Sequence, residues 1–244
     1  IMTEQDKIYC PVCARALVGE YDICPICNWE NDPNQLWKPN LSGGANEMSL
    51  NQARKAYGMK SNLILASGSP RRRELLSLYT TDFTVCASDF DESTVTADTP
   101  AHLVEQLAWG KCLAVAKGHP DAVVIGCDTV VDVGGEVFGK PHSVEDAKRM
   151  LRALSGATHA VHTGVCVSRG GRTESFVDSC RVTFFPISEE EIDRYAATKD
   201  PYDKAGAYAI QGRAALWLDR IEGDYYTIMG LPLSRTVQLV ERFV

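Results

Sequence analysis

The sequence predicts an α/β fold, a mixed sheet with flanking helices, preceded by a small cysteine-rich module at residues 1–60. Over residues 62–244, short apolar runs typical of buried strands alternate with helical segments that begin at capping residues. The Gly134-Gly135 pair in this region is typical of a hairpin turn, which argues against a purely parallel sheet. Two CxxC pairs within the first 27 residues set the module apart from the α/β region.

The predicted elements follow in chain order. Up to the hairpin we expect a helix at 49–57 capped by Ser49, a strand at 63–66, a helix at 71–79 with Pro70 at its first position, a helix at 100–116 capped by Thr99, and strands at 122–133 and 136–138. Beyond the hairpin we expect a helix opened by the Ser143-to-Asp146 capping box, strands on both sides of the 169–172 turn, a helix capped by Ser188, and a last helix at 233–243.

The composition is that of a globular protein, and it limits the classes of function. Of the 244 residues, 45% are hydrophobic and 23% are charged, and the formal net charge is −7. A net acidic chain argues against broad nucleic-acid binding, which draws on an excess of Lys and Arg. No apolar run approaches the roughly 18 residues of a membrane span, and the first eight residues are too polar for a secretory signal. We therefore expect a cytoplasmic protein with no membrane partner.

Cys10, Cys13, Cys24 and Cys27 form the two CxxC pairs, with ten residues between them. Each pair can form a tight turn whose sulfurs point at one ion, and two such turns complete a tetrahedral thiolate site. Structural zinc fits this pattern best, with iron in a rubredoxin-like site or redox dithiols as alternatives. Four thiolates leave no open coordination position, so we expect no catalytic metal here. The other five cysteines stand alone in apolar contexts and need only a packing role.

The module resembles the cysteine-rich CPCC domain family over about residues 9–60. The matching residues are Tyr9-Cys-Pro-Val-Cys13, Ile23-Cys-Pro-Ile-Cys27-Asn-Trp-Glu30, Gly43-Gly-Ala-Asn46 and Ala53-Arg54. The resemblance implies a metal-binding module. It brings no established activity and identifies no protein partner.

The segment 67–73 links a predicted strand to a helix start, which is a favourable place for an anion. The first N–H groups of a helix are free, and the helix dipole favours negative charge there. Ser67 and Ser69 add hydroxyl donors, Ser69 can also cap the helix, and Arg71 and Arg72 supply forked donors suited to phosphate. The alternative is an exposed basic first turn, which the dipole disfavours. The pattern favours a phosphate site, although Walker-loop spacing is absent.

Charged residues within apolar patterns mark further candidates. Lys111 lies on a helical stripe with Leu107, so it either snorkels from the edge of the core or points into a cleft toward an anion. Asp128 lies in an apolar strand, where a carboxylate is either paired structurally or part of a site. Lys140, and the pair Asp203 and Lys204, adjoin glycine-containing segments that suit either a close ligand or tight packing.

Over roughly residues 62–244 the chain resembles the Maf family of nucleoside triphosphate pyrophosphatases. The resemblance rests on the Lys111 helix and on ordered blocks: Leu65-Ala-Ser-Gly-Ser-Pro-Arg-Arg72, Asp91-Glu-Ser93, Gly126-Cys-Asp-Thr129, Gly139-Lys-Pro141, Leu154-Ser-Gly156, Asp203-Lys-Ala-Gly-Ala-Tyr208, Ile210-Gln-Gly212 and Gly230-Leu-Pro232. It implies two lobes around a cleft, as in the inosine triphosphate pyrophosphatases. It also implies hydrolysis of a nucleoside triphosphate to the monophosphate and pyrophosphate, with Mg²⁺ or Mn²⁺.

The resemblance implies a role for each candidate. Asp128 matches the proton acceptor, and Glu92 matches a second acid that helps to hold the cation, with Asp128 as the other ligand. The phosphate-contacting set is Ser67, Arg71, Arg72, Lys111, Lys140 and Lys204, and Ser69 and Asp203 complete the substrate-binding group. An arginine of the Ser-Pro-Arg-Arg turn, Thr129 and Gln211 match the branch that acts on dTTP and UTP.

The sequence thus predicts a hydrolase that acts on dTTP and UTP, or on modified pyrimidine nucleotides. An alternative from another class is a nucleotide-sensing regulator of cell division and septum formation, with the cysteine module docking a protein partner. A zinc-ribbon nucleic-acid binder fits poorly, because the module has a net charge of −1 and so lacks the excess of Lys and Arg that nucleic-acid binding requires. The sequence leaves a homodimer open.

Overall fold

The computed structural model describes residues 7–13, 16–56 and 62–243. The chain divides into two compact units, Ile1–Asn62 and Leu63–Val244. The buried apolar side chains of the small unit form one cluster, and those of the large unit form two others. None of the helices in the described ranges combines the length and the hydropathy that a bilayer crossing requires.

The small unit contains an antiparallel pair of two-residue strands, β1 (Ile8–Tyr9) and β2 (Leu17–Val18), and two short helices, α1 (Pro33–Trp37) and α2 (Leu50–Ala56). Ser49 and Gln52 exchange side-chain-to-backbone hydrogen bonds at the start of α2, as a capping box requires. The helix expected here is confirmed, although its predicted last residue, 57, lies outside the described residues.

The large unit is built on a seven-stranded mixed sheet in the order β4-β3-β5-β7-β8-β9, with β6 paired to β5. Its strands are β3 (Leu63–Leu65), β4 (Thr84–Val85), β5 (Val123–Val133), β6 (Glu136–Phe138), β7 (Thr158–Arg169), β8 (Arg172–Phe184) and β9 (Leu218–Glu222). Among the strands of residues 62–243, β3 pairs in parallel with β4 and β5, and the other pairs are antiparallel. The predicted mixed sheet is therefore confirmed.

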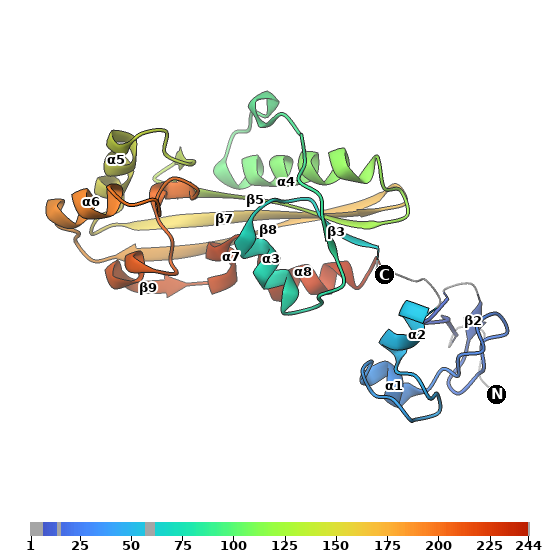
Figure 1. The fold of residues 1–244 in the computed structure, drawn as a ribbon. Helices are drawn as coiled ribbons and strands as arrows, with labels where there is room; N and C mark the ends of the chain where they lie inside the picture. The colour runs from blue at the N-terminus through green and yellow to red at the C-terminus, as the bar shows by residue number, and fades with distance from the viewer. Residues whose placement is uncertain (1–6, 14–15, 57–61, 244) are drawn as a thin grey trace. The chain divides into compact units, whose positions relative to one another are not determined.

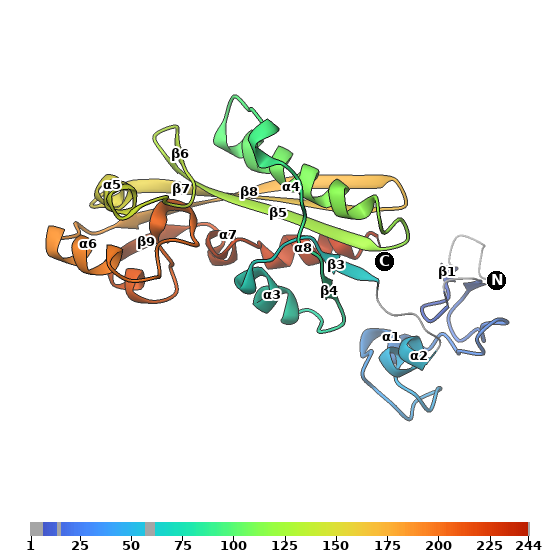
Figure 2. The ribbon, with the colours of Figure 1, turned by 45° about the horizontal axis from the view of Figure 1, so that its top comes forward.

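Six helices pack around this sheet: α3 (Pro70–Ser77), α4 (Pro100–Ala116), α5 (Val144–Leu154), α6 (Glu189–Ala196), α7 (Tyr225–Met229) and α8 (Leu233–Val240). Helix α4 lies along one face of the sheet, whereas α3, α7 and α8 lie on the other (Figure 1). Helices α5 and α6 lie side by side at one end (Figure 2). Short 3₁₀ segments occur at Glu92–Thr94, Ala205–Ala207 and Arg213–Trp217.

Helix α4 approaches the sheet closely because two glycines leave room for its backbone. A Cβ on Gly126 of β5 would lie 2.4 Å from the Ala108 carbonyl oxygen, and one on Gly164 of β7 would lie 2.3 Å from that of Val104. Side chains at these positions would push α4 away, since real Cβ atoms do not make such contacts. The two glycines therefore set the distance of α4 from β5 and β7.

Helix caps account for most of the agreement between sequence and structure. The hydroxyls of Thr99, Ser143 and Ser188 accept backbone N–H groups at the starts of α4, α5 and α6, as expected. One expected cap is wrong. Ser69 occupies the N-cap position of α3, but its side chain makes no capping bond, and its own N–H lies 3.3 Å from Ser67 Oγ.

Candidate active site

A pocket of about 920 Å³ lies beside β5, at the point where this strand continues past its three pairs with β3. All twelve residues that the sequence singled out in the large unit line its wall: Ser67, Ser69, Arg71, Arg72, Glu92, Lys111, Asp128, Thr129, Lys140, Asp203, Lys204 and Gln211. They come from segments distant in sequence, namely the β3–α3 turn, the start of α3, the 3₁₀ segment at Glu92–Thr94, α4, β5 and the loops after β6 and α6.

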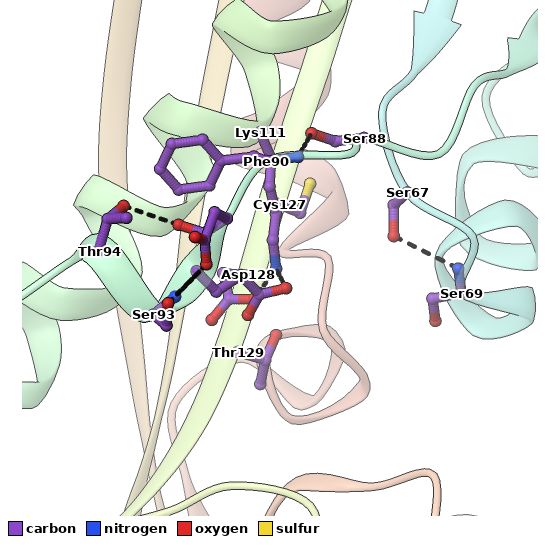
Figure 3. A network of polar contacts seen from close by, with 12 residues as sticks. Ser67, Ser69, Ser88, Phe90, Ser93, Thr94, Lys111, Cys127, Asp128 and Thr129 are labelled. Atoms are coloured by element: carbon purple, nitrogen blue, oxygen red, sulfur yellow. Dashed lines mark hydrogen bonds and ion pairs between the residues drawn. The ribbon is translucent and has the colours of Figure 1, made fainter.

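Lys111 and two carboxylates form the centre of the pocket. Lys111 Nζ lies 2.5 Å from Asp128 Oδ1 and 2.9 Å from Glu92 Oε1. Figure 3 shows the Lys111 side chain reaching from α4 to the Asp128 carboxylate on β5, with Thr129 beside it. Asp128 is buried and Lys111 is half-buried, whereas Glu92 is exposed. Of the two alternatives for Lys111, the structure supports the one in which it points into the cleft.

The segment that carries Glu92 is held against α4. Asp91 caps the turn Glu92–Thr94 by accepting a hydrogen bond from the Ser93 N–H at 3.0 Å. The Phe90 ring packs over Gly110, where an added Cβ would lie only 2.3 Å from Phe90 Cζ. Because Gly110 immediately precedes Lys111, this contact places Glu92 next to the ammonium group.

Arg72 is committed to contacts within the protein. Its Nη1 donates to Ser67 Oγ and to the Cys127 carbonyl, its Nη2 donates to Thr129 Oγ1, and its Nε donates to the Gly230 carbonyl. Four of its five N–H groups are thus used, which leaves one for a ligand. The structure favours Arg72 as a brace between α3, β5 and α7 over a full phosphate contact. The sequence could not reveal this, because Gly230 lies 158 residues away.

Other residues of the pocket wall carry further charge. Lys204 pairs with Asp203 and donates to the Asp200 carbonyl at 2.7 Å. Burial works against ionisation of Asp203, but Lys204 and then Arg71 outweigh it and lower the pKa of Asp203. Lys140 and Gln211 are exposed at the pocket wall.

The lining residues that sequence reasoning missed include His142, Asp146 and Arg149. Arg149 pairs with Glu136 at 2.8 Å and with Asp146 at 3.1 Å. The only signal for them in the sequence was the capping box at the start of α5. In total, six cationic and four acidic side chains line the pocket, a net charge of +2 with His142 neutral.

The four cysteines of the small unit converge as their spacing predicts. Their sulfur atoms all lie within 4.8 Å of one another, and the Cys10–Cys27 and Cys13–Cys24 pairs are 3.4 and 3.5 Å apart. Burial raises the pKa of Cys10 and Cys27. Burial also opposes the Cys24 thiolate, but the backbone groups of Cys27 and Ile26 outweigh it and lower the pKa of Cys24 to about 7. Four convergent sulfurs fit a metal site, and we call them the cysteine cluster.

The large unit combines a mixed α/β sheet with a pocket in which cationic side chains accompany a pair of carboxylates. This combination defines a protein suited to a phosphorylated ligand. Residues 62–243 match the family model described as Maf-like protein, and the chain belongs to this family. Residues 8–61 match the model described as Cysteine-rich CPCC.

Several relatives carry the name dTTP/UTP pyrophosphatase. The protein from Bacillus cytotoxicus is 46% identical over 74% of this chain and 94% of its own length. The protein from Bacillus velezensis is 47% identical over 76% and 98%, respectively. Among solved structures, the Ham1 protein of Staphylococcus aureus aligns with 74% of this chain and 96% of its own, at a TM-score of 0.44 and 16% identity. That likeness is too distant to bear on function.

Proposed function

We propose that the chain is a nucleoside triphosphate pyrophosphatase that hydrolyses dTTP and UTP to the monophosphate and pyrophosphate. The observation that carries this proposal is the Lys111, Asp128 and Glu92 centre within a cationic pocket. Relatives that are 46–47% identical over nearly their full length and are named dTTP/UTP pyrophosphatases support the choice of substrates.

Charge balance supports a divalent cation as cofactor, Mg²⁺ or Mn²⁺. A nucleoside triphosphate carries about four negative charges at neutral pH, whereas the pocket wall offers a net charge of +2. A divalent cation supplies the missing two charges. Asp128 and Glu92 present carboxylates to a common point, now occupied by the Lys111 ammonium, and hard cations prefer such oxygen ligands together with substrate phosphates. When bound, the cation would polarise phosphoryl oxygens and stabilise the charge on the leaving group.

Asp128 is the proposed proton acceptor. A water oxygen attacks the α-phosphorus, its proton passes to the Asp128 carboxylate, and the bond from the α-phosphorus to the bridging oxygen breaks to release pyrophosphate. Lys111, 2.5 Å from Asp128 Oδ1, keeps the carboxylate close to the reacting phosphate and offsets the charge that develops there.

The remaining residues have binding roles in this proposal. Ser67, Ser69 and the start of α3 supply hydroxyl and N–H donors to phosphate oxygens, and Arg71, Lys140 and Lys204 supply charge. Asp203 orients Lys204 through their ion pair. Thr129 and Gln211 contact the nucleoside, and Arg72 holds Thr129 in place through their hydrogen bond.

The cysteine cluster is proposed to hold a structural zinc ion, with iron as the alternative. The four sulfurs and the cluster of buried apolar side chains around them make the metal part of the small unit's own core. We therefore assign catalysis to residues 62–244, and we assign to the metal at residues 1–60 the role of stabilising the fold of that unit.

Release of pyrophosphate from dTTP, UTP, CTP, GTP and 7-methyl-GTP tests the proposal. We expect the highest kcat/KM with dTTP and UTP, and we expect Asp128→Asn to lower kcat by roughly 10²- to 10⁴-fold without changing the fold. Asp132→Asn is the matched control, because Asp132 lies on the same strand outside the pocket wall. Near-normal turnover in Asp128→Asn would refute its role. Tight nucleotide binding without turnover in the wild type would favour the regulatory alternative.

A further inference from the structure

The hydroxyl group of Thr129 belongs to a chain of hydrogen bonds that leads from the pocket wall into the core. Thr129 Oγ1 accepts a hydrogen bond from Arg72 Nη2 at 3.0 Å and lies 2.9 Å from Thr163 Oγ1. Thr163 Oγ1 in turn lies 2.8 Å from the backbone oxygen of Thr227. Thr163 and the Thr227 side chain are fully buried, so water cannot replace these partners.

The Thr227 carbonyl at the end of these hydrogen bonds determines which hydroxyl donates and which accepts at each step. A carbonyl oxygen only accepts, so Thr163 must donate its single hydroxyl hydrogen to Thr227. With that hydrogen used, Thr163 can only accept from Thr129, and Thr129 must therefore donate to Thr163. Thr129 also accepts from Arg72, which occupies one of its two lone pairs. A single acceptor site on Thr129 remains for a ligand.

A Thr129 hydroxyl that can only accept from the ligand cannot bind the phosphate groups, but it can bind a donor on the nucleoside. Phosphate oxygens of an ionised triphosphate are acceptors, so Thr129 cannot bind them. The hydrogen-bond donors of a pyrimidine nucleotide lie on its nucleoside, as the N3–H of uracil or thymine and the hydroxyls of the sugar. Cytosine has an acceptor at N3 instead, and the donor of its base is the exocyclic N4 amino group.

Resting on the proposed function, we propose that Thr163 and Arg72 are positioning residues that hold the Thr129 hydroxyl as an acceptor, so that it selects nucleotides through a donor on the nucleoside. Thr163 does this without touching the ligand, because it lies outside the pocket wall. The same polarity would disfavour cytosine, whose N3 and the Thr129 oxygen would both be acceptors.

Thr163→Val is the decisive variant. It keeps the shape of the side chain but removes the acceptor, which frees the Thr129 hydrogen to turn toward the ligand. The Thr227 carbonyl keeps its second donor, the Gly230 N–H at 3.1 Å. We expect kcat/KM for UTP to fall about tenfold, the value of one neutral hydrogen bond, with no fall for CTP or N3-methyl-UTP if the donor is N3–H. If the donor is the sugar 3′-hydroxyl, which UTP shares with dTTP, the values for UTP, CTP and N3-methyl-UTP fall together and the value for 3′-deoxy-UTP does not.

Two further variants separate positioning from a general structural effect. Thr163→Ser retains the hydroxyl and should retain wild-type discrimination. In a Thr129→Val background, Thr163→Val should change no substrate ratio further, because the group through which it acts is gone. If Thr163→Val does not fold, Thr129→Val against Thr129→Ser tests the same acceptor directly.

The proposal would be overturned if Thr163→Val lowered kcat/KM equally for UTP, CTP, N3-methyl-UTP and 3′-deoxy-UTP. It would also be overturned if no ratio of these kcat/KM values differed between Thr163→Val and the wild type. Failure of the proposed function is recognised separately, since the wild type would then release no pyrophosphate from UTP. In that case the same ratios are measured from equilibrium binding of α,β-imido-UTP and α,β-imido-CTP, which cannot be cleaved at the scissile position.

Discussion

Lowering the pH should destabilise the large unit through one buried histidine. His159 of β7 is only 2% exposed, and its Nε2 lies 2.8 Å from the hydroxyl oxygen of Tyr208. The rings of Phe184 and Tyr208 pack edge-on against it, and its Nδ1 has no hydrogen-bond partner among the residues that the structure describes. A charged imidazolium would be poorly solvated here. Burial accordingly lowers the pKa of His159 to about 4.

The sign and size of the effect follow from the difference between the two states. His159 in the unfolded chain has an ordinary pKa of about 6.5, so between there and its folded pKa of about 4 the unfolded state binds more protons. The free energy of unfolding therefore falls as the pH falls through this window and changes no further below it. Between pH 7 and pH 5 the loss due to His159 is about 2 kcal/mol.

Urea unfolding of the full chain at pH 7 and pH 5 measures this loss. His159→Gln removes the titrating ring and keeps an amide near the position of Nε2, so its free energy of unfolding should fall about 2 kcal/mol less than that of the wild type over this interval. His102→Gln is the control for the substitution itself, because His102 is exposed on α4 and lies outside the buried cluster around His159. Equal losses in the wild type and His159→Gln would refute the reasoning.

Three further predictions concern the close contacts of the fold. Gly164→Ala should lower the free energy of unfolding by roughly 1–3 kcal/mol, because the added Cβ would lie 2.3 Å from the α4 backbone. Gly118→Ala is the control, because its Cβ would have its nearest contact at 3.7 Å, and its free energy of unfolding should stay within about 0.5 kcal/mol of the wild type. Urea unfolding compares the two variants. Phe90→Ala should raise the Mg²⁺ concentration needed for half-maximal pyrophosphate release several-fold, because Glu92 loses its support, whereas Phe90→Leu should stay close to the wild type; an unchanged Mg²⁺ requirement would count against that support. A strong zinc chelator should release about one metal ion per chain and unfold the small unit only, as metal analysis and calorimetry would show; a metal content near zero before chelation would contradict the cysteine cluster's assignment.

Predictions from the sequence succeeded where a local pattern is strong. The apolar run of β5, the Gly134-Gly135 turn and the capped starts of α4, α5 and α6 each depend on residues adjacent in the chain. The short strands β4 and β9 were not predicted. Both are largely exposed, so neither shows an apolar alternation to recognise. The strand order was not predictable either, because β3 pairs with a strand some sixty residues later.

The residue types of the pocket could be predicted, but their contacts could not. Lys111 on an apolar stripe and Asp128 in an apolar strand were conspicuous because each violates its local pattern, and the structure brings them together. Which group meets which depends on tertiary packing. The partners of Arg72 and Thr129, namely the Gly230 carbonyl and the Thr163 hydroxyl, belong to residues with no distinctive local pattern for these contacts. Such partners become visible only when distant strands and turns lie together.

Paired strands of the sheet are separated by very different lengths of sequence, and this difference influences the order in which they fold. Strands β7 and β8 form twelve pairs around a two-residue turn, whereas β3 forms three parallel pairs with β5 and two with β4. Local hairpins close quickly, while short parallel pairings over long loops close slowly. Strand β3 should therefore dock late, onto a scaffold already built by β5, β7 and β8. Ser67 lies in the turn after β3, and Arg72 lies in the first turn of α3 that follows. Because both line the pocket, nucleotide binding would report on completion of folding.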